Sequence, residues 1–144
     1  MHLHEDSLGF LIADVYRLLR RAFQKRLEAS SSLTLAQAQT LVYIARNEGV
    51  RQVVIADMLD VQPITLARLL DQLAAAGLVE RRPDPADRRA HQLYLTPEAA
   101  PQLTAIREVG AAIRAETLQG LTKDQVETAL LVLSQMRDQL AVRG

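Results

Sequence analysis

Four arginines lie within an eleven-residue stretch of a chain whose formal net charge is zero. This segment, RRPDPADRRAH at 81–91, also holds two prolines and two aspartates, residue types that favour a tight turn. Arginine carries a flat, weakly hydrated cation that pairs with phosphate and suits the negative potential of a narrow DNA minor groove. The segment therefore indicates a stiff turn that presents cations to an anionic partner. A carboxylate such as that of Asp87 is expected to hold a neighbouring guanidinium in one orientation.

A second group of side chains with binding chemistry belongs to the stretch VQPITLARLLDQLAAAG, residues 61–77. Leu66, Leu70 and Leu73 recur at helical spacing, so they predict one buried face of a helix. The side chains expected to point outward are Pro63, Ile64, Thr65, Ala67, Arg68, Asp71 and Gln72. Arginine can pair with guanine and threonine can contact the thymine methyl group, so this face indicates recognition of base edges in a major groove.

Two short helices joined by a tight turn are needed to position this face. The stretch QVVIADMLD, residues 52–60, predicts the first helix, and Pro63 suits the first turn of the second. Ala56 is small enough for a close crossing of the two helices, and Val61 supplies an apolar side chain for the turn. Asp60 stands where glycine is usual, because aspartate tolerates left-handed backbone geometry better than most residues.

Strand-like alternation follows in LVERR, residues 78–82, and in HQLYLT, residues 91–96. These stretches predict a β-hairpin with the proline- and aspartate-rich turn at its tip. The order helix, turn, helix, hairpin is that of a winged helix-turn-helix, in which the second helix enters a major groove and the hairpin reaches an adjacent minor groove. The expected fold class is therefore mainly α with a small β-hairpin.

Further helices are predicted on both sides of this winged core. Thr34 is placed to cap a helix that ends at Gly49, and Thr122 is placed to cap the last helix. Between them, Thr96 is expected to cap a helix whose first turn contains Pro97.

The flanking helices, about 7–29 and 97–142, carry more leucine, valine and isoleucine than one small winged core can cover. A homodimer would bury these residues, and a two-fold protein matches a pseudo-palindrome with half-sites about 10 base pairs apart. We therefore expect a single winged-helix domain over 1–144, with dimerisation helices at 7–29 and 97–142 around a DNA-binding core at 34–96.

Composition excludes several classes of function. The chain has 144 residues, 49% hydrophobic and 24% charged, which is ordinary for one globular domain. Lys plus Arg and Asp plus Glu both total 17, so DNA binding must depend on local geometry and not on the overall field. The absence of cysteine excludes disulfides and thiol-based redox sensing. The chain has no signal-peptide pattern and no apolar run of about 20 residues, so a cytoplasmic protein without membrane association is expected.

An enzyme is the weakest of the functional hypotheses. The sequence has no glycine-rich phosphate loop, HExxH pattern or nucleophile elbow. Asp84 and Asp87 are expected on an exposed tip with no pocket, where they serve turn formation. His2 and His4 lie near the beginning of the chain with no third ligand nearby, so no metal and no other cofactor is expected.

The whole chain resembles the MarR family of bacterial transcription regulators, in particular its SlyA-like branch. The segment GLVERRPDPADRRAHQLYLT, residues 77–96, is similar to the family's wing. The segment DSLGFLIADVYRLLRR, residues 6–21, and the last two helices are similar to its dimerisation elements. The resemblance implies a homodimeric regulator that binds double-stranded DNA at a pseudo-palindromic operator and acts as a ligand-responsive repressor.

The resemblance also implies roles for particular residues. It identifies Asp87, Arg88 and Arg89 as the tip of the wing, with Arg89, or alternatively Arg88, entering the minor groove. The full set of expected DNA contacts is Pro63, Ile64, Thr65, Ala67, Arg68, Gln72, Asp87, Arg88 and Arg89.

A small anionic aromatic effector is a further expectation that comes from the resemblance alone. In the family such compounds can lodge between the dimerisation helices and the winged domain, a junction expected here at Tyr16, Arg17, Arg20 and Gln37. Tyr16 and Gln37 would hydrogen-bond the compound and Arg17 would pair with its carboxylate. The alternative is that these side chains only pack or contact the other subunit.

The winged core has other interpretations. The charged tip could be a solvated turn, and Arg68 could be a surface residue paired with Asp71 or Gln72. A winged-helix protein without an effector, acting as a nucleoid-type or competitive factor, is a second DNA-binding hypothesis. A winged-helix module for protein assembly would bind no DNA. The orientation of Arg68 and Arg89 discriminates, because DNA binding requires them to project from one surface.

Overall fold

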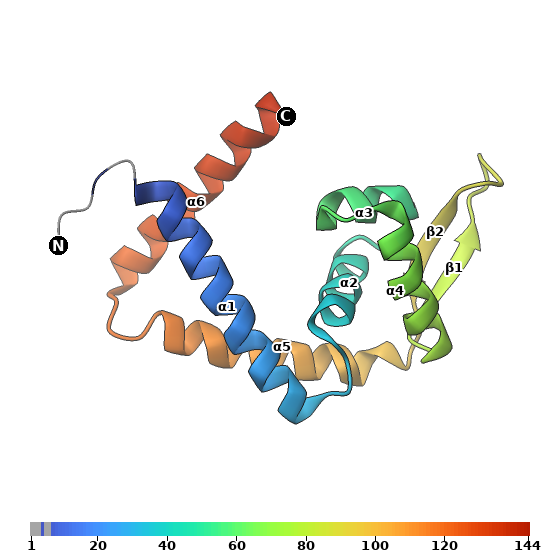
Figure 1. Ribbon diagram of the computed structural model, residues 1–144, viewed down its shortest axis with the longest axis horizontal. Helices are drawn as coiled ribbons and strands as arrows, with labels where there is room; N and C mark the ends of the chain where they lie inside the picture. Colours follow the sequence, from blue (N-terminus) through green and yellow to red (C-terminus); the bar gives the residue numbers. More distant parts are fainter. Residues whose placement is uncertain (1–3, 5–6) are drawn as a thin grey trace. The chain divides into compact units, whose positions relative to one another are not determined.

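The computed structural model describes residue 4 and residues 7–144, which form six α-helices and one two-stranded antiparallel sheet (Figure 1). The helices are Leu8–Ser30 (α1), Leu35–Arg46 (α2), Gln52–Leu59 (α3), Pro63–Ala75 (α4), Ala99–Thr117 (α5) and Lys123–Arg143 (α6). The strands are Val79–Pro83 (β1) and His91–Leu95 (β2). The chain divides into two compact units, one that ends at Gly110 and one that begins at Ala111. The predicted fold class, mainly α with a small hairpin in a winged helix-turn-helix, is confirmed.

The hydrophobic core of the first unit lies between α2, α3, α4 and the hairpin. Leu66, Leu70 and Leu73 are at most 1% exposed, so the predicted buried face of α4 is confirmed. Fully buried side chains from the other elements meet them, namely Leu41, Ile44, Ile55 and Leu93. In Figure 1, α4 runs beside β1, with which it is in contact. The buried leucines thus determine which face of α4 remains available to a partner.

The turn between α3 and α4 has the predicted geometry. Asp60 adopts a left-handed backbone conformation, with φ 53° and ψ 46°. The Val61 N–H donates to the Ala56 carbonyl at 3.0 Å, and Ala56 is only 3% exposed. A small residue at 56 and a left-handed residue at 60 together allow the two helices to cross closely.

The hairpin is antiparallel, with a register that pairs Val79 with Leu95 and Pro83 with His91. A short extended segment before α3 adds to the outer edge of β2. There the Gly49 N–H donates to the Leu93 carbonyl at 2.8 Å, and the Leu93 N–H donates to the Val50 carbonyl at 3.1 Å. The base of the wing is therefore attached to the same segment that leads into α3.

Two of the predicted helix caps form as complete capping boxes. The Thr34 hydroxyl accepts from the Gln37 N–H at 3.2 Å, while the Gln37 side chain accepts from the Thr34 N–H at 2.9 Å. Thr122 and Gln125 repeat the arrangement at the start of α6. The helix after Thr34 ends at Arg46, before Gly49, whose φ is 84°.

The prediction that Thr96 caps the fifth helix is wrong. Its hydroxyl donates instead to the Gly77 carbonyl at 2.5 Å, and its N–H donates to the Leu78 carbonyl at 3.0 Å. These bonds continue the pairing of the two strands by one residue, so Thr96 closes the base of the hairpin. Helix α5 begins three residues later, at Ala99.

Two helices leave large apolar side chains uncovered. In α1 these side chains are between 42% and 77% exposed, and they are Leu8, Phe10, Leu11, Ile12, Val15, Tyr16 and Leu18. Helix α6 has no buried residue, and Leu130, Leu133 and Leu140 on it are 64%, 51% and 72% exposed. Exposed apolar surface of this kind is typical of a protein interface. None of the described helices combines the length and apolarity that a bilayer crossing requires.

Candidate nucleic-acid interface

The face of α4 opposite its buried leucines is open to solvent. Five of the six side chains expected to contact DNA from this helix are exposed, and Ala67 is half-buried; the exposed five are Pro63, Ile64, Thr65, Arg68 and Gln72. Ile64 is 66% exposed, so its side chain is not part of the core. The start of α4 therefore presents a mixed apolar and polar surface that the fold does not itself use.

Arg68 does not pair with either of the neighbours considered from the sequence. The Asp71 carboxylate accepts from Arg81 Nη2 at 2.6 Å, and the Gln72 side chain accepts from Gln37 Nε2 at 2.9 Å. Within the described chain, the Arg68 side chain has no hydrogen bond or ion pair. Its exposed guanidinium is therefore available to a partner of the protein.

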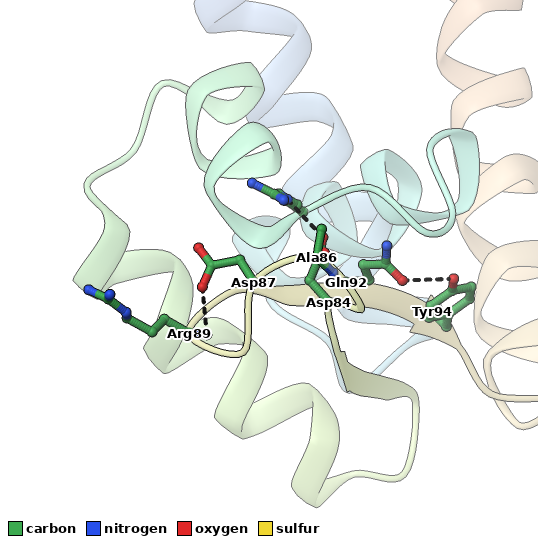
Figure 2. A network of polar contacts seen from close by, with 7 residues as sticks. Asp84, Ala86, Asp87, Arg89, Gln92 and Tyr94 are labelled. Atoms are coloured by element: carbon green, nitrogen blue, oxygen red, sulfur yellow. Dashed lines mark hydrogen bonds and ion pairs between the residues drawn. The ribbon is translucent and has the colours of Figure 1, made fainter.

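The wing tip, residues 84–90, is organised by a backbone hydrogen bond of the Asp87 carboxylate. The Asp87 carboxylate accepts from the Arg89 backbone N–H at 3.0 Å, as Figure 2 shows. The expectation that it would hold a guanidinium is therefore wrong. A short aspartate side chain readily bonds the backbone two residues ahead, and that local bond forms here. Arg89 in the same view points away from the strands.

Within the wing tip, the carboxylate that pairs with a guanidinium is that of Asp84. It accepts from Arg51 Nε at 2.8 Å and from the Ala86 N–H at 2.7 Å. These hydrogen bonds, that from Arg51 above all, hold the pKa of Asp84 below its ordinary value. Asp84 was expected on an exposed tip, yet its side chain is only 6% exposed, because Arg51 and the turn cover it.

The sequence did not point to Arg51 as part of the wing, because its partner Asp84 lies 33 residues later in the chain. It stands at the N-cap of α3 and makes no side-chain capping bond there. Serine, threonine, asparagine and aspartate are the usual residues at that position. An arginine at a predicted N-cap is thus the signal in the sequence that could have pointed to a role elsewhere in the fold.

The other two arginines of the segment are used within the fold. Arg81 donates to Asp71 and, at 3.1 Å, to the Ala67 carbonyl, so it ties β1 to α4. The Arg82 guanidinium lies 3.8 Å from the centroid of the Tyr94 ring and pairs with Glu80 at 3.2 Å. Of the four arginines at 81–91, only Arg88 and Arg89 have side chains that are both exposed and unpaired within the described chain.

A cavity of about 270 Å³ joins the predicted contact elements. Its lining comes from the starts of α3 and α4 and from the wing, and consists of Arg51, Gln52, Val53, Ala56, Pro63, Asp87, Arg89, Ala90 and His91. Pro63 and Arg89 thus line the same cavity, although they are 26 residues apart in the sequence. The structure brings the start of α4 and the wing tip together on one side of the first unit.

The residues expected to bind an effector fall into two local groups. On α1, the Arg17 guanidinium pairs with Asp14 at 3.4 Å, and that of Arg20 lies 5.6 Å from the centre of the Tyr16 ring. Gln37 is held at the start of α2 by its capping box and by Gln72. Among the described residues no hydrogen bond joins Gln37 to the α1 group. The effector site stays a prediction.

The described residues contain no group of three histidine or acidic side chains arranged to hold a metal ion. His2 lies outside the described residues.

Two short helices joined by a tight turn, followed by a hairpin with exposed arginines at its tip, define a winged helix-turn-helix protein. A family model described as MarR family matches residues 31–90. The structure is similar to wild-type MarR in its apo form from E. coli, with a TM-score of 0.79 and 32% identity over 90% of this chain and 96% of that one. The chain belongs to the MarR family of transcription regulators.

Two further solved structures are similar over nearly their whole length. One is a mutant MarR from E. coli complexed with operator DNA, with a TM-score of 0.77 and 31% identity over 90% of this chain and 92% of that one. The other is a crystal structure of MarR with a TM-score of 0.85 and 27% identity, covering 99% of this chain and 97% of that one. These similarities confirm the resemblance to the MarR family.

Proposed function

We propose that this protein is a homodimeric repressor that binds a pseudo-palindromic operator in double-stranded DNA and responds to a small anionic ligand. The observation that carries the DNA-binding part is the pair of free arginines, Arg68 on α4 and Arg89 on the wing tip. Pro63 and Arg89 border the same cavity, so both contact elements open on one side of the first unit. A similar structure is complexed with operator DNA, which supports this assignment. The wing sequence at 77–96 also supports our proposal that the chain belongs to the SlyA-like branch of the family.

In this proposal α4 lies in a major groove and reads base edges. Arg68 would pair with guanine, Thr65 and Ile64 would contact thymine methyl groups, and Gln72 would hydrogen-bond a base or phosphate. Arg89 would enter the adjacent minor groove, whose negative potential favours a guanidinium. Phosphate contacts supply most of the affinity and base contacts supply the sequence preference.

Substitution of the two arginines tests this function. Arg89→Ala should weaken binding to all sequences and lower the salt dependence by about one unit of slope, because one phosphate-region cation is lost. Arg68→Ala should cost about 1–3 kcal/mol at a single base position and relax the preference there. The measurement is fluorescence anisotropy against DNA selected from a random pool and against unselected DNA, at several salt concentrations.

Arg114→Ala is the matched control, because it removes the same exposed charge from α5, outside the winged core. Its affinity for DNA should stay close to that of the wild type. Unchanged affinity in both Arg68→Ala and Arg89→Ala would contradict the DNA-binding function and favour a winged-helix module for protein assembly.

The dimer is supported by the apolar faces of α1 and α6. Within one chain the large side chains of these faces remain at least 42% exposed. A two-fold assembly that covers them would present two copies of α4 at a fixed spacing, which matches half-sites about 10 base pairs apart.

The ligand response is proposed to involve Arg17 of α1. Its guanidinium is half-exposed and its ion pair with Asp14 is on the surface, so an incoming carboxylate can replace that weak interaction. A ligand weakens DNA binding only if it binds more tightly to the protein when the two recognition helices have a spacing that does not fit DNA. A tenfold loss of DNA affinity requires a coupling free energy between ligand and DNA of about 1.4 kcal/mol. Salicylate-like compounds should therefore weaken operator binding in the wild type and much less in Arg17→Ala.

Arg21→Ala is the control for this response, because Arg21 is an exposed arginine of the same helix outside the predicted set. It should respond to the compounds like the wild type. Calorimetry that detects no binding at millimolar concentration, or an equal response in Arg17→Ala, would contradict the ligand site.

A further inference from the structure

Asp84 is the one charged side chain that is buried among the described residues. It lies at the first position of an otherwise exposed tip, where a buried carboxylate is costly unless its hydrogen-bonding capacity is used. The bonds from Arg51 and from the Ala86 N–H meet this requirement. The burial of Asp84 therefore depends on a residue from a different part of the chain.

Arg51 connects the tip to the helical body. Its backbone forms an isolated bridge with Gln92 of β2, and its side chain reaches across to Asp84. In the described part of the chain, the bond from Arg51 to Asp84 is the single hydrogen bond between the tip, 84–90, and a residue outside the hairpin. Every other hydrogen bond of the tip stays within 84–90, including that from the Asp84 N–H to the Ala90 carbonyl at 3.0 Å.

The position of Arg89 follows from this connection. The Asp84 N–H bond to Ala90 closes the tip, and the Asp87 carboxylate holds the Arg89 backbone inside it. The tip is thus an internally bonded loop that one ion pair fastens to the start of α3. Loss of that pair would leave the loop formed but free to swing about the end of the strands.

We propose that Arg51 is a positioning residue for the wing. Its ion pair with Asp84 holds the tip beside α3 and so determines where Arg88 and Arg89 meet DNA. This role rests on the proposed DNA-binding function. Pre-orientation of the tip lowers the entropy lost when the arginines dock.

The sign of one mutational effect distinguishes this role from simple electrostatics. Asp84 is an anion on a surface that is proposed to approach phosphates, so its neutralisation should strengthen DNA binding if charge alone matters. If Asp84 instead anchors the tip through Arg51, the same neutralisation should weaken binding. Asp84→Asn keeps the shape of the side chain, removes its charge and replaces one of its two acceptor oxygens with an NH2 donor, so it cannot accept from both Arg51 and the Ala86 N–H.

The expected result for Asp84→Asn is about tenfold weaker binding to selected DNA, the cost of re-ordering one or two side chains on docking. Its salt slope should equal that of the wild type, because no phosphate-binding cation is lost. Asp57→Asn is the matched control, since Asp57 is an exposed aspartate of α3 whose side chain has no hydrogen bond or ion pair in the described chain. That control should bind DNA as tightly as the wild type or slightly more tightly.

Arg51→Met and the double variant complete the test. Two residues that act as a unit give non-additive effects, so Arg51→Met should weaken binding by the same factor as Asp84→Asn, and the double variant by no more. A larger loss in Arg51→Met, with a lower salt slope, would show that Arg51 binds phosphate itself and would overturn the positioning role.

A readout without DNA separates this inference from the proposed function. In Arg51→Met, titration of the Asp84 carboxyl carbon by NMR should show the pKa rising toward the ordinary range, because the Arg51 hydrogen bond is lost. An unchanged pKa of Asp84 in Arg51→Met would contradict the hydrogen bond between Arg51 and Asp84. A folded Asp84→Asn variant with unchanged or tighter DNA binding would overturn the positioning role alone. A wild-type protein that binds no DNA would overturn the proposed function and this role with it.

Discussion

Replacement of Leu130 and Leu133 by glutamate is expected to convert the protein to a monomer and to abolish operator binding. The two leucines lie three residues apart on one face of α6 and are 64% and 51% exposed in a single chain. A dimer that covers this face would have to desolvate two unpaired carboxylates per protomer, which is strongly unfavourable. A monomer has one recognition helix, so affinity for a two-half-site operator should fall by about a thousandfold or more, toward non-specific binding.

Light scattering over a range of protein concentrations measures the oligomeric state, and anisotropy measures operator binding. Because both leucines are exposed in one chain, the circular dichroism of the protomer should be preserved. The control is the double variant Gln135→Glu, Gln139→Glu, which adds the same charge to α6 at exposed positions that helical spacing places opposite the leucines. A glutamate variant at 130 and 133 that stays dimeric and binds the operator would contradict the proposed interface.

Leu70→Ala is expected to lower the free energy of unfolding by about 2–5 kcal/mol. Leu70 is 0% exposed, and its removal leaves a cavity between α4 and the rest of the winged core. A loss of this size is a large part of the stability of a typical domain. Urea denaturation at one fixed protein concentration is the measurement, because the stability of a dimer depends on concentration.

Ile64→Ala is the matched control on the same helix. Ile64 is 66% exposed, so its truncation should change the unfolding free energy by no more than about 0.5 kcal/mol. The same variant should weaken operator binding if Ile64 contacts a base, as proposed. Equal losses of stability in the two variants would mean that the buried face of α4 has been wrongly assigned.

Some features of this protein follow from residues that are close together in the sequence. The spacing of Leu66, Leu70 and Leu73 was enough to orient α4, because the helical period puts them on one face. The left-handed turn at Asp60 and the cap at Thr34 were predictable for the same reason, since their bonding partners lie within a few positions. The candidate base-contacting surface of α4 is what remains once this face is buried.

Local chemistry was not enough where a side chain had a choice of partners. Thr96 is a good helix cap by type, yet its hydroxyl bonds Gly77 because the hairpin brings that carbonyl within reach. The aspartates of the tip likewise differ in role although both suit a turn. Asp87 bonds the backbone beside it, while Asp84 is buried against Arg51.

The candidate site therefore divides into a part that the sequence determined and a part that only the tertiary structure decided. Helical and hairpin periods predicted which elements present Arg68 and Arg89. Which arginines remain unpaired depends on partners in other elements of the fold, since Arg81 pairs with Asp71 of α4 and Arg51 pairs with Asp84 of the wing tip. An ion pair acts over a few ångströms in space and not along the sequence, so only the folded chain determines which charges meet and which are left for DNA.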